Sequence, residues 1–261
     1  MILEAYFDDS SDQHRSKYYA CGGTLGSADQ WDLFEVLWSI ETGNLKEPVR
    51  SSDCECGQGQ FENWTKPDRD SLMKRLVEIT DRVGLYGYAA VVPISDSKEA
   101  FPDLEIKEAF RLVATQVIFN MAVIANDVGR DAKLWFESGL SDGSVLNAFK
   151  SVRGLDWKPN RRLLGINFRD KTLRALQAAD LVAGESFKHM DNFGVRQPRK
   201  PVHELSERLI FMCWTLSTLK YIGQKGWPNE MEFLVKIDDE LPESAKLRHF
   251  WKGSLRKQLD K

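Results

Sequence analysis

The chain has 261 residues, of which 42% are hydrophobic and 11% aromatic, so it can bury a large core as one large domain or as a domain with an appendage. Its formal net charge is only −3, and its four cysteines are too few and too unevenly spaced for a disulfide framework or a zinc site. The N-terminal segment has no basic stretch and no cleavage pattern typical of export, and these features together favour a cytoplasmic protein with no membrane role.

The first third of the chain has apolar periodicities that change from strand-like to helical. In chain order it predicts a β-hairpin of residues 2–7 and 17–25, helices at 29–40 and 69–83 around a loop at 43–67, and a buried strand at 83–93. The remainder alternates between the two kinds of element. It predicts a helix at 106–128, a strand at 133–136, a helix at 142–152, a strand at 163–168 and a helix at 173–190.

This order of elements is that of the ribonuclease H fold, an α/β architecture with a mixed five-stranded sheet flanked by helices. We expect a ribonuclease H-like domain at residues 1–195, with a helical insertion at about 27–82 before the third strand. Residues 196–261 are expected to form a C-terminal helical extension that packs on the same domain. This extension would contain an apolar helix at 209–219 and a basic helix carrying Arg248, Lys252 and Arg256.

Charge is spread unevenly along the chain. Residues 1–60 hold 4 Lys or Arg against 11 Asp or Glu, a difference of −7, whereas residues 151–200 hold 11 against 5, a difference of +6. An acidic pocket beside a basic surface is what phosphate chemistry on metal ions requires, although charges that only cover solvated faces give the same counts.

Three acidic positions carry the functional hypothesis. Asp8 and Asp9 end the predicted first strand, Glu137 ends the fourth, and Asp180 lies in the last predicted helix. Strands one and four are neighbours in this topology, so their ends can meet the helix. Mg²⁺ or Mn²⁺ takes oxygen ligands, and converging carboxylates would hold such ions for phosphodiester cleavage. Strand parity places Asp8 with Tyr6 and Asp9 on the other face, and spacing alone does not select between them.

Asp180 is the most informative of these acids because helical spacing puts it on the apolar face of its helix. The same face carries Leu173, Leu176, Gln177, Leu181 and Gly184. A carboxylate packed against a sheet needs a positive partner, and small residues such as Ala179 and Ala183 allow the helix to approach closely. A metal ion would supply that charge. The alternatives for Asp180 are an ion pair with Arg169, Lys171 or Lys188, or a helix register that turns it to solvent. Glu137 could instead be a solvated turn residue or a charge at a helix N-terminus, and Asp8 and Asp9 could be hairpin-turn residues.

Three segments resemble the family known as domain of unknown function 3800 (DUF3800), of the ribonuclease H-like group. The family's first strand typically ends in Asp-Glu-Ser-Gly, which is similar to the run Asp8, Asp9, Ser10, Ser11. Its late helix reads Leu-Gln-x-Ala-Asp-Leu, which residues 176–181 match at every specified position. A middle block, residues 52–55 followed by Phe61 and Trp64, is similar to a segment in which an acid lies near the site.

The resemblance selects Asp8 over Asp9 as the first-strand acid and makes Asp53 a secondary candidate. Asp8, Glu137 and Asp180 would then be both the catalytic residues and the ligands of Mg²⁺ or Mn²⁺. The supporting residues would be Asp9, Ser10, Asp53 and Gln177. Nucleic acid, DNA or RNA, would be held by Arg161, Arg162, Arg169, Lys171 and Arg174.

The leading hypothesis is therefore a divalent-metal-dependent nuclease. One alternative is a non-catalytic module that binds nucleic acid or a protein partner within a defence or mobile-element system, although a pure binder gains nothing from three uncompensated acids. A second alternative is a hydrolase of small phosphorylated molecules, which would have a closed pocket. A homo-oligomer is compatible with the sequence, which does not determine the oligomeric state.

Overall fold

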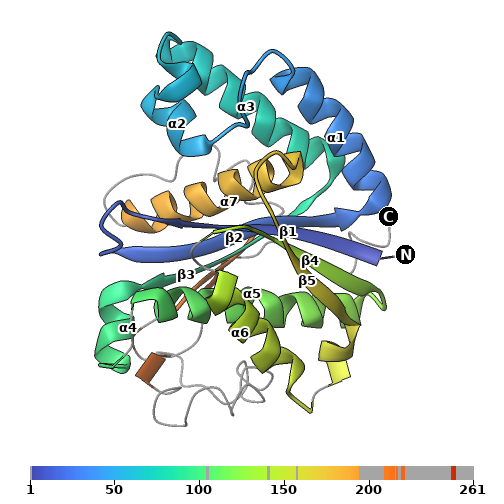
Figure 1. Cartoon of the computed structure of the whole chain (residues 1–261), viewed down its shortest axis with the longest axis vertical. Helices are drawn as coiled ribbons and strands as arrows, with labels where there is room; N and C mark the ends of the chain where they lie inside the picture. Colours follow the sequence, from blue (N-terminus) through green and yellow to red (C-terminus); the bar gives the residue numbers. More distant parts are fainter. Residues whose placement is uncertain are drawn as a thin grey trace.

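The structure is a computed structural model that describes residues 2–103, 106–139, 142–156, 158–193, 209–214, 216, 219–220 and 248–250. Its centre is a mixed sheet with helices on both faces (Figure 1), which confirms the predicted α/β class. The strands are β1 (Ile2–Ser11), β2 (Tyr18–Ser27), β3 (Tyr86–Pro93), β4 (Asp131–Glu137), β5 (Leu163–Arg169), β6 (Leu209–Cys213) and β7 (Arg248–Phe250).

The strands lie in the order β5-β4-β1-β2-β3-β6-β7. Strands β1, β2 and β3 form an antiparallel meander, β4 runs parallel to β1, and β5 runs parallel to β4. The prediction that the first and fourth strands are neighbours is therefore confirmed. This pairing brings the carboxyl end of β4 beside the middle of β1, because Phe7 pairs with Phe136.

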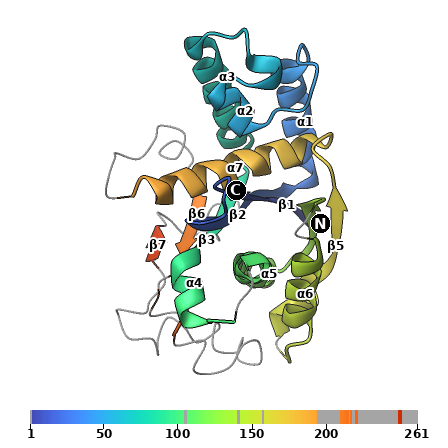
Figure 2. The same cartoon turned by 60° about the vertical axis from the view of Figure 1, so that its left-hand side comes forward.

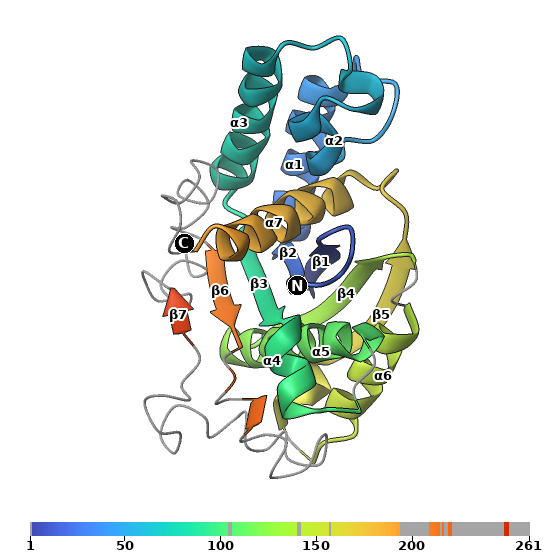
Figure 3. The ribbon, with the colours of Figure 1, turned by 90° about the vertical axis from the view of Figure 1, so that its left-hand side faces the viewer.

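Helices cover both faces of the sheet. They are α1 (Ala28–Thr42), α2 (Ser51–Cys56), α3 (Lys66–Val83), α4 (Ile94–Ala100), α5 (Ile106–Asp127), α6 (Asp142–Arg153) and α7 (Arg174–Asp191), with 3-10 turns η1 (Gly59–Phe61) and η2 (Lys158–Arg162). Helix α7 lies on one face, and α5 and α6 lie on the other (Figure 2). Helices α1, α2 and α3, which the chain inserts between β2 and β3, stack beyond α7 (Figure 3).

Two hydrophobic cores lie on opposite faces of the sheet. Alternation along β1 sends Phe7 toward α5 and Tyr6 toward α7 and the insertion. The second core contains Trp31, Phe34 and Trp38 of α1, which are buried on the side of the helix that faces the sheet and α3. The insertion is thus attached to the sheet by an aromatic core and not by a flexible linker.

The prediction that residues 43–67 form a loop is wrong in part, because this segment contains helix α2 and turn η1. These elements are too short for a periodic apolar pattern, and they are held by Cys54 and Phe61, which are fully buried against α3. Helix α4 was not predicted either. The first strand is longer than expected and continues to Ser11, because the hairpin turn starts only at Asp12, whose carboxylate accepts hydrogen bonds from Ser16 and Lys17.

The five-stranded sheet and the helical extension predicted for the C-terminal part need correction. Leu209–Cys213 is strand β6, parallel to β3, and Arg248 lies in strand β7, so the described part of the chain contributes seven strands to the sheet. A short apolar run is compatible with either a helix or a strand, and pairing with the open edge of β3 decides for the strand. Lys252 and Arg256 lie outside the described residues.

Helix α5 contains a stretch, Ala109–Asp127, that is long and apolar enough to cross a membrane, with a mean hydropathy of 1.4. However, 78% of this window is buried inside the protein. Its side chains, among them Val113, Val117 and Ile118, form the core beneath the sheet. Burial against the sheet accounts for its apolar character.

Helix α7 approaches β2 as closely as its small residues predicted. A Cβ atom added to Gly22 would lie 2.7 Å from the Cα atom of Ala183. We expect Gly22→Ala to push α7 from the sheet and to lower the free energy of unfolding by about 1–3 kcal/mol, measured by urea denaturation. Gly165→Ala on β5 is the control, because no atom lies within 4 Å of the added Cβ there. Equal effects at both glycines would contradict the close-approach argument.

Candidate functional site

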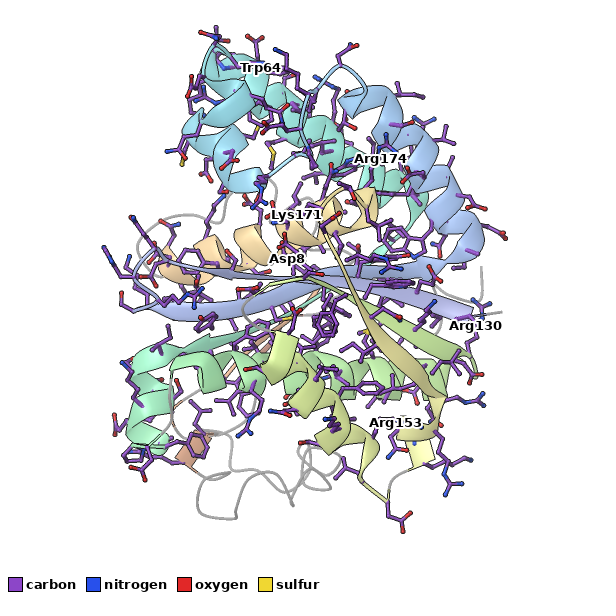
Figure 4. All side chains as sticks on the ribbon, viewed as in Figure 1. Asp8, Trp64, Arg130, Arg153, Lys171 and Arg174 are labelled. Atoms are coloured by element: carbon purple, nitrogen blue, oxygen red, sulfur yellow. The ribbon has the colours of Figure 1, made fainter. Side chains whose placement is uncertain are left out.

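The structure decides which first-strand acid faces the last helix. Asp8 points to the same side as Tyr6, toward α7, and its side chain is only 1% exposed. Asp9 follows the strand alternation to the other face and pairs with Cys21 of β2. Figure 4 shows Asp8 between the sheet and α7, close to Lys171.

The three predicted acids converge on one point, which is occupied by the ammonium group of Lys171. Its Nζ atom lies 2.9 Å from Asp8 Oδ2, 3.2 Å from Glu137 Oε2 and 2.6 Å from Asp180 Oδ1. The acids come from β1, the end of β4 and α7, so the sheet topology and the packing of α7 bring them together. Lys171 was one of the three partners that the sequence offered for Asp180, and it is the partner found.

Lys171 is held in place by its loop, which joins β5 to α7. The side chain of Asp170 accepts hydrogen bonds from the backbone and the hydroxyl of Thr172, which fixes the turn. The carbonyl of Lys171 accepts a hydrogen bond of 2.9 Å from Gln177 Nε2. The turn at Asp170 and Thr172 and the hydrogen bond to the Lys171 carbonyl therefore fix the backbone that places the ammonium group in the cluster.

The helical insertion also contacts the cluster. The backbone N–H of Ser51, the first residue of α2, donates to Asp180 Oδ2 at 2.6 Å. Gln177 Oε1 accepts from Trp38 Nε1 at 2.9 Å and from the backbone N–H of Val49 at 3.3 Å. Gln177 thus joins the insertion to the loop that carries Lys171.

Protonation in the cluster follows from burial and charge. Burial raises the pKa of Asp8 well above its ordinary value and outweighs the lowering by Lys171, and Glu137 and Asp180 raise this pKa further. For Asp180, burial is opposed by Lys171 and by the hydrogen bonds from Ser51, which together lower its pKa. The pKa of Lys171 is raised, since its carboxylate partners outweigh its burial.

A divalent cation fits the chemistry of this donor set. Three carboxylates share one ammonium group, which lies 2.9 Å from Asp8 Oδ2, so three acidic groups face one basic group here. Carboxylate oxygens are the ligands that Mg²⁺ and Mn²⁺ prefer. The acids as placed surround the ammonium, and the described part of the chain holds no group of three or more His, Cys, Asp or Glu side chains already arranged for a metal ion.

The other predicted supporting residues lie around the cluster. Asp9 is next to it along β1, and burial and then the charge of Glu137 raise its pKa. Ser10 follows on β1, opposite Ala20. Asp53 lies on α2 two residues after Ser51, where its carboxylate accepts a hydrogen bond from Ser52. The backbone N–H of Asp9 donates to Asp8 Oδ1 at 2.7 Å, whereas no hydrogen bond or ion pair among the described residues joins the carboxylate of Asp9 or of Asp53 to the cluster.

The predicted nucleic-acid-binding residues divide into two groups. Lys171 is 7% exposed and bound by acids, Arg162 forms an ion pair of 3.0 Å with Asp131, and Arg174 pairs with Glu35. Arg161 and Arg169 are exposed and form no ion pair with the described residues. Only the second group keeps its charge available on the surface.

Ser51 was not predicted as part of the site, and Lys171 was predicted as a partner of Asp180 and as a nucleic-acid contact but not as the cation shared by all three acids. The contact from Ser51 could not be found, because it depends on how the insertion docks on α7. The central place of Lys171 had a partial signal, since Asp170 and Thr172 around it are typical turn residues.

Comparison with protein-family models and with curated proteins finds no match. Among solved structures, a chain in the structure of the PCNA:RNase HII complex from Archaeoglobus fulgidus aligns at 11% identity, covering 98% of this chain and 99% of that chain. The TM-score is 0.38, a similarity too low to carry an argument. The site is therefore assigned from its own geometry.

Proposed function

We propose that this chain is a divalent-metal-dependent phosphodiesterase that cleaves nucleic acid, with a ribonuclease H-like arrangement of strands. The observation that carries the proposal is the convergence of Asp8, Glu137 and Asp180 within 3.2 Å of one cation position. The order β5-β4-β1-β2-β3 supports it, because this is the strand order expected for a ribonuclease H-like sheet. The resemblance to DUF3800 stays a prediction.

Asp8, Glu137 and Asp180 would hold the metal ion, which supplies Lewis acidity and lowers the pKa of bound water. The chain's own residues do the positioning. Ser51 and Gln177 fix Asp180 and the Lys171 loop, and burial keeps water from Asp8. Glu137 and Asp180, whose side chains are 21% and 13% exposed, form the side of the cluster that solvent and substrate can reach.

The second candidate function is the non-catalytic binding module, and it is favoured by Lys171. An ammonium group that permanently occupies the cation position would balance part of the acid charge without any metal. The small-molecule hydrolase has less support. A pocket of about 430 Å³ is lined by Asn63, Trp64, Asp68, Ser71 and Arg75. It lies on the insertion, far from Asp8 (Figure 4).

One assay separates the two leading candidates. The full chain is incubated with labelled single- and double-stranded DNA and RNA in MnCl₂, MgCl₂ or EDTA, and Mn²⁺ binding is measured by calorimetry in parallel. The nuclease proposal predicts cleavage that needs Mn²⁺ or Mg²⁺, with Mn²⁺ bound by the protein. Binding of nucleic acid without cleavage and without Mn²⁺ binding would overturn the proposal in favour of the module.

A further inference from the structure

Beside the acid cluster, the sheet has a partly uncovered surface formed by β4 and β5. Helix α7 packs on β1 and β2, so the neighbouring strands are less covered on that side. Their side chains there include Lys133, Trp135 and Asn167, which are half-buried, and Arg169, which is exposed. We call Lys133, Trp135 and Arg169 the β4–β5 platform.

Both cations of the platform are placed over the ring of Trp135. Lys133 Nζ lies 4.3 Å from the ring centroid, and Arg169 Cζ lies 5.6 Å from it. The ring is itself fixed, because it stacks on Tyr6 with centroids 6.0 Å apart and planes 6° apart. A cation over an aromatic face is held in position while it keeps its full charge.

Neither cation forms an ion pair with an acid among the described residues. The cross-strand neighbour of Lys133 is Glu4, whose carboxylate accepts a hydrogen bond of 2.6 Å from Tyr6 and forms no ion pair with Lys133. The cross-strand neighbour of Arg169 is Glu137, which pairs with Lys171. Arg162, Lys171 and Arg174 are all ion-paired, so Lys133 and Arg169 differ from most of the basic residues around them.

The β4 side chains of the platform form a row that leads to the acid cluster. Lys133, Trp135 and Glu137 alternate along one face of β4, and successive members of such a row lie about 6.6 Å apart. The row therefore starts at a free cation and ends at an acid of the cluster, with Arg169 beside that end. A polyanionic strand that follows the row would meet two fixed cations before it reaches the acids.

We propose that the β4–β5 platform binds the phosphate backbone of the nucleic-acid strand whose neighbouring phosphodiester enters the acid cluster. This inference rests on the proposed function and names the surface that would recognise its substrate. The occupant is a polyanion because the platform presents uncompensated positive charge next to an acidic site. Trp135 is a positioning residue, because its ring stacks on Tyr6 and contacts both cations.

The test measures binding of fluorescein-labelled single- and double-stranded oligonucleotides by anisotropy in EDTA over a range of salt concentrations. Lys133→Gln and Arg169→Gln are each expected to weaken binding about fivefold, and to lower the slope of log affinity against log salt by about 0.7–0.9. Lys74→Gln on α3 is the control, because Lys74 is an exposed residue of the insertion paired with Glu78, and it should leave affinity and slope unchanged. In the Mn²⁺ cleavage assay, both platform variants should raise KM and change kcat less than twofold.

The failures of the two proposals are distinguishable. If the parent cleaves nucleic acid and the platform variants bind as it does, the platform inference is wrong and the nuclease proposal stands. If the parent neither binds nor cleaves any of the oligonucleotides, both are wrong. A dimer seen by light scattering in the parent and lost in the platform variants, with unchanged oligonucleotide affinity, would assign the platform to a second copy of the chain and overturn the inference.

Discussion

Asp8→Asn and Asp180→Asn are each expected to reduce Mn²⁺-dependent cleavage by at least about 1000-fold, which corresponds to about 4 kcal/mol in the activation free energy. Each substitution replaces a carboxylate of the convergent cluster by a neutral amide of the same size. The remaining acids would hold a divalent ion less tightly and in a different place. Rates are measured with a labelled oligonucleotide, and Mn²⁺ affinity by calorimetry.

The matched control is Asp70→Asn. Asp70 is an exposed acid on α3 that pairs with Lys66, so its substitution should leave the cleavage rate unchanged. Loss of folding is a separate cause of inactivity, and circular dichroism of each variant tests for it. Asp8→Asn should stay folded, because its carboxyl group already has a raised pKa and a neutral side chain suits its burial. Full activity in both cluster variants would exclude the proposed site.

Lys171→Met should have the largest effect on stability. Its ammonium, with a side chain only 8% exposed, is the one cation shared by Asp8, Glu137 and Asp180. Removing one partner of a buried ion pair leaves uncompensated charge and costs about 3–5 kcal/mol. We expect a loss of this size in the free energy of unfolding at pH 7 in EDTA, measured by urea denaturation. Lys74→Met is the control, because that side chain is 63% exposed and should change stability by less than about 0.5 kcal/mol.

The pH dependence of this loss has a defined sign. In the parent, Asp180 has a lowered pKa, so its ion pair contributes stability above the ordinary value of 3.8, and that contribution disappears only as the pH falls through the lowered pKa. In the variant, the unpaired carboxylates gain protons at higher pH, which removes their repulsion. The difference between parent and variant should therefore shrink as the pH is lowered from 7 toward 4. A constant difference would show that Lys171 acts through packing alone.

Mn²⁺ connects this prediction with the proposed function. If the carboxylates can hold a divalent ion, excess MnCl₂ should recover much of the stability that Lys171→Met loses, because a ligand that binds only the folded state stabilises it. The parent should gain less, since the metal ion must compete with its own ammonium group. A variant that Mn²⁺ does not stabilise would favour the binding module, in which Lys171 is the permanent cation.

The sequence by itself determined the elements whose apolar pattern is long and regular. It predicted the hairpin, α1, α3 and the alternation from α5 to α7, because a periodic run buries one face only in one kind of element. It also placed Asp180 on the buried face of its helix and predicted that the first and fourth strands would be neighbours. The elements follow from local sequence patterns, and the strand pairing follows because few connections between such elements are allowed.

Only the tertiary structure decided what surrounds those acids. Strand parity left Asp8 and Asp9 equivalent until α7 was packed on one face. Charge alone offered three partners for Asp180, and the turn at Asp170 selected Lys171. The strand β6 and the contact from Ser51 depend on an open sheet edge and on a docked insertion, both of which join residues far apart in the chain. Short segments carry too little local preference to specify such pairings, so long-range packing fixes them.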